Sequence, residues 1–201
     1  GTQFDGLGHV GIGDIFYNGF DRRDFHTAKG LTKLGIENAG AFLTRGVLLD
    51  IAGLKGTKRL EKDYEITAQD LQDALDREKV EIHQGDAVLI HTGWGTLWKV
   101  DNDLFTSVEP GIGVEAANFL VNHEICMVGS DSWATEVIPN PNPDLQFPVH
   151  QILIPLNGIY NLENLDLSGL ARDKVYEFAF FFAPLRLKGF AGSPGNPVAV
   201  R

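Results

Sequence analysis

Short apolar runs alternate with amphipathic stretches along most of this chain. Apolar runs at residues 47–52, 87–91 and 125–128 are short and largely uninterrupted, a pattern that predicts buried strands. A further run at residues 175–183 contains four phenylalanines and predicts a strand for the centre of a core or for an oligomer interface.

Two stretches between these runs have helical character. Thr67 provides a hydroxyl N-cap and Asp70 an acid in the first turn, which predicts a helix from about residue 67 to about residue 79. A second helix is expected over residues 114–122, where Val114, Ala117 and Val121 lie along one face. Strands separated by helices indicate an α/β fold.

Length and charge limit the classes of function. The 201 residues contain no linker or repeat, so we expect one domain spanning 1–201. A formal net charge of -10 with no basic cluster disfavours nucleic acid and anionic membranes as partners. No apolar stretch approaches the roughly 20 residues that cross a bilayer, and the single cysteine is compatible with a cytoplasmic location.

The opening segment concentrates polar side chains among glycines. Gln3 and Asp5 point to the same side if the backbone is extended, and Gly6 and Gly8 let the chain turn so that His9 approaches them. A carboxylate beside an imidazole suits metal binding or proton transfer. A frayed polar terminus explains the same residues equally well.

His150 and Glu163 are the other candidates for chemistry. Pro148 predicts a helix start just before His150, and Glu163 ends an apolar stretch in which a carboxylate is costly to bury without a partner or cation. From residue statistics alone, both are more often satisfied structural residues.

The opening segment resembles the signature of the cyclase family of metal-dependent hydrolases, which includes bacterial kynurenine formamidase, isatin hydrolase and trans-dienelactone hydrolase. The family pattern is His-x-Gly-Thr-His-x-Asp-x-Pro-x-His. Gly1 and Thr2 match its Gly-Thr, Asp5 its Asp and His9 its last His, whereas Gln3 stands where the second His is usual. The first His would precede Gly1 by two residues, so we expect an N-terminal segment to be missing.

Later blocks similar to the family's follow in the same order. They are Arg45–Asp50, Gly85–Trp94, Val128–Trp133, Phe147–Leu165 and Gly192–Ala199. The resemblance implies an α/β fold of the swivelling β/β/α type with a barrel-like sheet core, assembled as a homodimer or larger homo-oligomer.

The resemblance also implies a site. Asp5, His150 and Glu163 would be metal ligands, with Gln3 a weaker fourth, around one divalent ion, Mn or Zn. His9 would be the general acid and base of catalysis, and Glu163 would anchor the ion as part of the catalytic machinery.

Three further residues are candidates for substrate contacts. Trp94 and Asp131 follow predicted strands at positions where α/β proteins collect ligand contacts. Phe4 could line an apolar pocket for an aromatic or cyclic substrate. Core packing is the alternative for Trp94 and Phe4, and Asp131 could organise the site by hydrogen bonds.

These residues together predict an enzyme for a small-molecule substrate. The expected reaction is hydrolysis of a carbon–nitrogen bond in a small cyclic or aryl amide by metal-activated water. The alternatives are a lactone hydrolase or lyase of the same family, and a metal-free binding homologue without catalysis.

Overall fold

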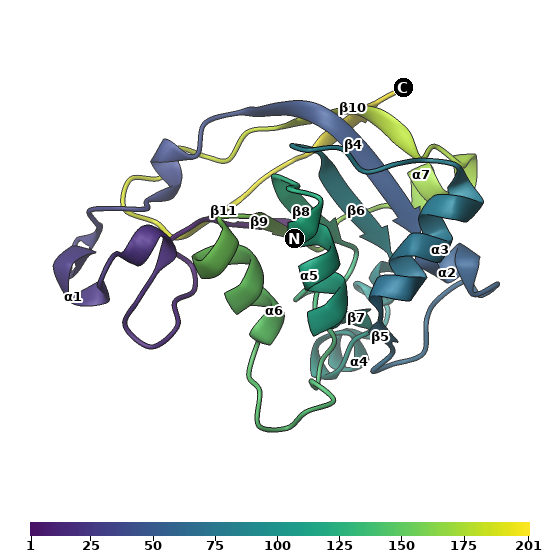
Figure 1. Cartoon of the computed structure of the whole chain (residues 1–201), viewed down its shortest axis with the longest axis horizontal. Coiled ribbons are helices and arrows are strands. Elements are labelled where there is room, and N and C mark those ends of the chain that lie inside the picture. The colour runs from purple at the N-terminus through teal and green to yellow at the C-terminus, as the bar shows by residue number, and fades with distance from the viewer.

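The computed structural model describes residues 1–201 and is built around one eight-stranded sheet (Figure 1). Across the sheet, the strands are β11 (Gly192–Pro194), β1 (Gln3–Asp5), β9 (Tyr160–Glu163), β8 (Met127–Ser130), β6 (Ala87–His91), β4 (Phe42–Asp50), β10 (Glu177–Phe182) and β12 (Val198–Val200). Strands β4, β6, β8 and β9 are parallel, whereas β1 is antiparallel to β9 and β10 is antiparallel to β4. Two small sheets pair β2 (His26–Thr27) with β3 (Gly30–Leu31) and β5 (Glu65–Ile66) with β7 (Gly111–Ile112).

Seven α-helices accompany the large sheet. They are α1 (Arg22–Phe25), α2 (Ile51–Leu54), α3 (Ala68–Glu78), α4 (Asn102–Ser107), α5 (Val114–Asn122), α6 (Pro148–Gln151) and α7 (Ser168–Asp173). Short turns of helix are η1 (Tyr17–Gly19), η2 (Ile36–Asn38), η3 (Trp94–Leu97) and the π-helical η4 (Ile152–Leu156). Figure 1 shows α3, α5 and α6 along the same side of the sheet, while the segment with α1 extends away at one end. None of the helices has the length and apolar character needed to cross a membrane.

Side-chain alternation divides the central strands between two cores. Val47, Val88 and Val128 face the helices and pack with α3 and α5, whereas Leu48 and Leu89 face the other side. The period of two follows from the pleat of a strand. A sheet with apolar residues on both faces must be covered on both, so its centre is buried.

The sheet curls until its distant strands meet. The rings of Phe4 in β1 and Phe182 in β10 are 4.9 Å apart, although four strands lie between β1 and β10 in the sheet order. Phe42 and Tyr160 join the same aromatic cluster on the concave side. This curl is the barrel-like core expected from the sequence, and the predicted α/β fold is confirmed.

Elements predicted from local signals are found with small shifts. Helix α3 begins after Thr67, whose hydroxyl accepts from the Asp70 N–H in a complete capping box. The predicted helix 114–122 and strand 87–91 match α5 and β6 at both ends. The strand predicted to end at residue 52 ends at Asp50 instead, because the Asp50 carboxylate caps α2.

The remaining two strands also differ from their predicted limits. The run at 125–128 forms a strand two residues later, as β8, and the run at 175–183 is shorter, as β10. In β10 the side chains alternate, so Phe178, Phe180 and Phe182 are buried whereas Phe181 is 42% exposed on the outer face.

Candidate functional site: a buried carboxylate and histidine cluster

Two neighbouring antiparallel strands place four polar side chains on one face of the sheet. Gln3 pairs with Glu163, and Asp5 pairs with Asn161. Because alternate residues of a strand share a face, the side chains of all four residues project to the same side. This is the helix-covered face, on which the central strands carry valines.

The residues between them explain why this arrangement is stable. Phe4 and Leu162 project to the opposite face and are fully buried in the concave core. The buried central residues, Phe4 in β1 and Leu162 in β9, therefore fix the side of the sheet to which the flanking polar side chains point. Turning either strand over would bury two polar side chains in the aromatic cluster, at a cost of about 1–3 kcal/mol for each unpaired group.

Helix α6 supplies His150 above this polar patch. Pro148 occupies the first helical position, as the sequence predicts. The imidazole Nδ1 is bonded to a carboxylate oxygen of Glu136, which also accepts the His150 backbone N–H at 3.0 Å. With Nδ1 engaged, Nε2 faces the sheet, 3.4 Å from Glu163 Oε1 and 3.7 Å from Asp5 Oδ2.

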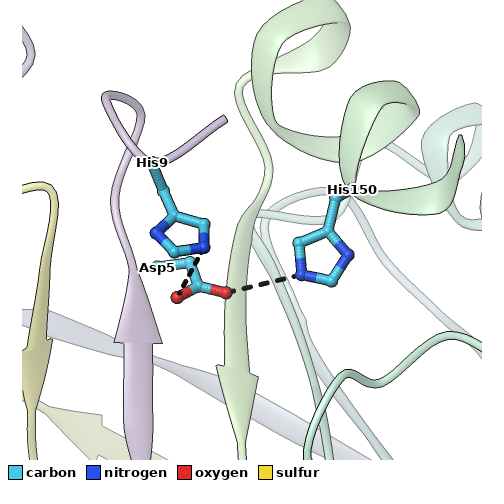
Figure 2. Close-up of side chains that lie close together, drawn as sticks. All are labelled: Asp5, His9 and His150. Atoms are coloured by element: carbon cyan, nitrogen blue, oxygen red, sulfur yellow. Dashed lines mark ion pairs between the residues drawn. The ribbon is translucent and has the colours of Figure 1, made fainter. Parts of the chain in front are cut away.

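His9 approaches the cluster from the loop after β1. Figure 2 shows the Asp5 carboxylate between the two imidazoles, with His9 Nε2 3.6 Å from Asp5 Oδ1. The turn is closed by the His9 N–H donating to the Gly6 carbonyl. The glycines serve close packing here: a Cβ on Gly8 would lie 2.5 Å from Leu31 Cδ1.

Burial and neighbouring charges shift the pKa values of the side chains in this cluster. Burial disfavours ionisation of Asp5, but hydrogen bonds from His150 and Gln3, together with the charges of His150 and His9, outweigh it and lower the Asp5 pKa. Burial raises the pKa of Glu163 to about 7, and the nearby Asp5 charge adds to this rise. The pKa of His150 is raised well above its usual value because Asp5, Glu136 and Glu163 outweigh its desolvation. The cluster therefore favours positive charge beside its carboxylates.

The donor set fits a divalent cation. Ligand atoms of Asp5, His9 and His150 all lie within 4.8 Å of one another. Ligands held about 2.1 Å from one zinc ion are at most about 4.2 Å apart, and the distances from His150 Nε2 to Asp5 Oδ2 and Glu163 Oε1, 3.7 and 3.4 Å, are within this limit. The Asn161 side-chain oxygen is buried without a partner, while its N–H group donates to both Asp5 and Glu163.

A pocket of about 670 Å³ opens beside the cluster. Its base includes Gln3, His9, His150 and Glu163, so the polar patch faces the pocket. This volume lies within the roughly 300–1,000 Å³ that is usual for small-molecule sites.

Most of the predicted site residues are brought together. Asp5, His9, His150 and Glu163 converge, although the first and last of these are more than 150 residues apart in sequence. Gln3 lies at the edge of the cluster, and its side-chain amide donates to Asp5 Oδ1 at 2.8 Å. In this arrangement Gln3 is a hydrogen-bond donor to Asp5, and its side-chain nitrogen points to that carboxylate.

For Phe4 and Trp94 the structure favours the core-packing alternative. Phe4 is 0% exposed and packs in the concave core, on the face of β1 opposite to Asp5, so it does not line the pocket beside the cluster. Trp94 is also buried, in a cluster with Leu97 and Phe105, and its indole N–H donates to the Phe105 carbonyl. The alternation of β1 and the packing of η3 decide these two positions.

Asp131 also lies outside the pocket that contains the cluster. Its carboxylate accepts from the backbone N–H groups of Thr92 and Gly95, which holds the loop between β6 and η3. It borders a second pocket of about 230 Å³ together with His91. The hydrogen bonds of Asp131 fit the alternative in which it organises a neighbouring loop, and a substrate contact for Asp131 stays a prediction.

Sequence reasoning missed Asn161 and Glu136. For Asn161 a signal was present, since Asn161 and Glu163 flank Leu162 as Gln3 and Asp5 flank Phe4. Glu136 belongs to an irregular segment 14 residues before His150, and no local pattern indicates that its carboxylate orients the imidazole. It is fully buried and has the usual partner role for a metal-binding histidine.

Comparison with known proteins places the chain in a family. The Cyclase family model, described as "Putative cyclase", matches residues 1–137. A crystal structure described as that of a novel cyclase is 36% identical, with a TM-score of 0.90, and the match covers 100% of this chain and 67% of that one. No curated protein matches the chain.

Two further solved structures share the fold at lower identity. Isatin hydrolase A from Ralstonia solanacearum is 22% identical, with a TM-score of 0.72 over 100% of this chain and 72% of that chain. A predicted metal-dependent hydrolase from Bacillus stearothermophilus is 21% identical, with a TM-score of 0.61 over 99% of this chain and 75% of that chain. On the family match and the 36% identity, the chain belongs to the cyclase family.

Proposed function

We propose that this protein is a metal-dependent hydrolase of a small cyclic or aryl amide. The observation that carries the proposal is the convergence of two buried carboxylates and two imidazoles beside a pocket lined by His9, His150 and Glu163. The names of structural neighbours, isatin hydrolase and metal-dependent hydrolase, point to the same class of reaction.

Asp5, His150 and Glu163 are the proposed ligands of one Mn or Zn ion. Nitrogen and carboxylate donors suit both metals. When bound, such an ion polarises a carbonyl and lowers the pKa of water at the site. Glu136 holds the His150 ring so that Nε2 faces the cluster, and Asn161 holds the two carboxylates through its N–H group.

His9 is the proposed proton carrier. Its side chain is 33% exposed, whereas the side chains of Asp5 and His150 are nearly inaccessible, so His9 is the imidazole that reaches the pocket most freely. Asp5, 3.6 Å away, stabilises the imidazolium after it accepts a proton from water. The same imidazole then returns the proton to the leaving nitrogen.

One observation favours a rival function. Asp5 already has hydrogen-bond partners in Gln3 and Asn161 and an ion-pair partner in His150, so the cluster is partly compensated without metal. A metal-free protein that binds a small molecule in the same pocket is therefore the second candidate.

The two candidates are separated by metal analysis and turnover of the same preparation. Protein purified without chelator is expected to contain close to one Mn or Zn per chain and to hydrolyse isatin, with activity lost on chelation and restored by the metal. A folded, metal-free protein that binds isatin but does not open its ring would support the binding function and overturn the hydrolase.

A further inference from the structure

We infer that the pocket is built for an uncharged aromatic substrate, which it holds between Phe147 and Trp133. The inference rests on the proposed function, because it names the substrate class of the same site. It separates this protein from enzymes whose substrates carry a carboxylate beside the reacting amide or lactone.

The side chains that line the pocket carry little charge beyond the cluster. Apart from the ligand cluster residues His9, His150 and Glu163, every residue that lines the pocket is uncharged, and none is lysine or arginine. A substrate carboxylate that enters the pocket loses water and finds no lysine or arginine to pair with, and His150 is already paired with Asp5, Glu136 and Glu163. Near Glu163 and Asp5 it also meets like charge, unless it binds the metal in place of the reacting carbonyl.

Two aromatic residues give the pocket an apolar wall. Phe147 and Trp133 both line the pocket, and the Phe147 ring meets the edge of His150 at a centroid distance of 5.6 Å and an interplanar angle of 87°. Phe147 is 42% exposed, an unusual exposure for a ring that touches a buried histidine. A flat apolar ligand would cover this exposed area and gain aromatic contacts.

The backbone of Phe147 supports a role for its ring. Phe147 is the N-cap of α6 and adopts a left-handed conformation, with φ of 48°. A bulky residue in this region costs about 1–2 kcal/mol, and such strain is retained mainly where it serves a site. Here it directs the ring toward the pocket from the helix that carries His150.

The remaining polar lining suits a neutral ligand. Gln3, Gln146, Gln151 and Asn164 offer amide donors and acceptors without formal charge. Such groups can pair with the carbonyl and N–H of a cyclic amide without the desolvation cost of an ion.

The test compares matched ligands that differ only in charge. Turnover is measured with isatin and isatin-5-carboxylate, and binding with oxindole and oxindole-5-carboxylate by calorimetry. The uncharged member of each pair should be preferred by about 100-fold, the discrimination expected when a buried charge lacks a partner. Equal kcat/KM or equal affinity within a pair would overturn the inference.

A matched pair of variants tests the aromatic wall. Phe147→Ala should weaken oxindole binding by about 10-fold and raise KM for isatin with little change in kcat. Phe181→Ala is the control, because Phe181 has the same 42% exposure but lies on the outer face of β10. Similar effects of the two substitutions would contradict the assignment of Phe147.

A third variant tests the charge argument by gain of function. Gln146 lines the pocket and is exposed, so Gln146→Arg adds a cation without opening the core. It should improve binding of oxindole-5-carboxylate relative to oxindole by about 10-fold. No change for the carboxylate would count against the inference.

The two proposals fail in different ways. If isatin is not hydrolysed but oxindole still binds in preference to its carboxylate, the hydrolase proposal fails and the substrate class stands. If isatin and isatin-5-carboxylate are hydrolysed equally, the hydrolase stands and the inferred class is wrong. If oxindole does not bind at all, the inferred class is wrong whatever the activity.

Discussion

Glu136 offers the sharpest test of the proposed metal site, because it touches the proposed ligand His150 and does not line the pocket beside it. Its carboxylate accepts from His150 Nδ1 and from the backbone N–H groups of Val149 and His150. In Glu136→Gln the single amide oxygen can take the place of Oε1 and keep the bonds with Nδ1 and the His150 N–H group, while the amide N–H group faces Val149. The bond to Nδ1 then no longer ends on a charged group, so the imidazole loses the carboxylate that strengthens it as a metal ligand.

The size of the effect follows from the lost contact. A hydrogen bond to a charged group contributes about 1.5–3 kcal/mol, which corresponds to about 10–100-fold in an equilibrium constant. This agrees with the 10–100-fold loss of metal affinity that is typical when a carboxylate behind a histidine ligand is removed. We therefore expect Glu136→Gln to bind Zn or Mn about 10–100-fold more weakly than the native protein.

The assay is isothermal titration of chelator-treated protein with Zn²⁺ and Mn²⁺, with circular dichroism to confirm folding. Glu109→Gln is the matched control. Glu109 is equally buried and accepts two neighbouring backbone N–H groups, those of Trp133 and Ala134, but does not touch His150. A folded Glu136→Gln protein whose affinity stays within about 3-fold of the native value would refute the proposed role.

Four further outcomes are expected. His9→Ala should reduce turnover by about 100-fold or more with metal content intact, whereas His150→Ala should lose the metal; loss of metal from His9→Ala would make His9 a ligand. Gln3→His should raise metal affinity in calorimetry, and unchanged affinity would place position 3 outside the coordination shell. Burial raises the pKa of Glu109 to about 8 from an ordinary 4.5, so stability should fall as pH rises through this range, and Glu109→Gln should show a smaller fall in urea unfolding of the metal-free protein. Phe4→Ala should destabilise the fold by about 3–5 kcal/mol, because Phe4 fills the concave core, and a small change would contradict that position.

Local signals in the sequence were sufficient for several elements. The capping residues Thr67 and Asp70 located α3, and Pro148 located the start of α6. These signals work because a helix end must satisfy its own backbone groups within one turn of chain. The limits of β4 were less well predicted, because Asp50 leaves the strand to cap the following helix.

The sequence predicted only part of the candidate site. The family signature pointed to Asp5, His9, His150 and Glu163, which the fold brings together. The aromatic character of Phe4 left a pocket position and core packing as alternatives, and the alternation of β1 places Phe4 in the opposite core. A strand residue and its neighbour must face opposite sides, so Phe4 and Asp5 cannot line the same pocket.

By itself, the sequence determined the elements, the α/β class and the residues with chemistry, since these depend on the spacing of neighbours along the chain. Only the tertiary structure decided how the chemistry is assembled. The pairing of Asp5 with Asn161 joins positions 156 residues apart, and the Glu136 carboxylate reaches His150 from an irregular segment. Such contacts depend on strand register and on the packing of α6 over the sheet, and neither has a local signal because both are set by burying the two cores at once.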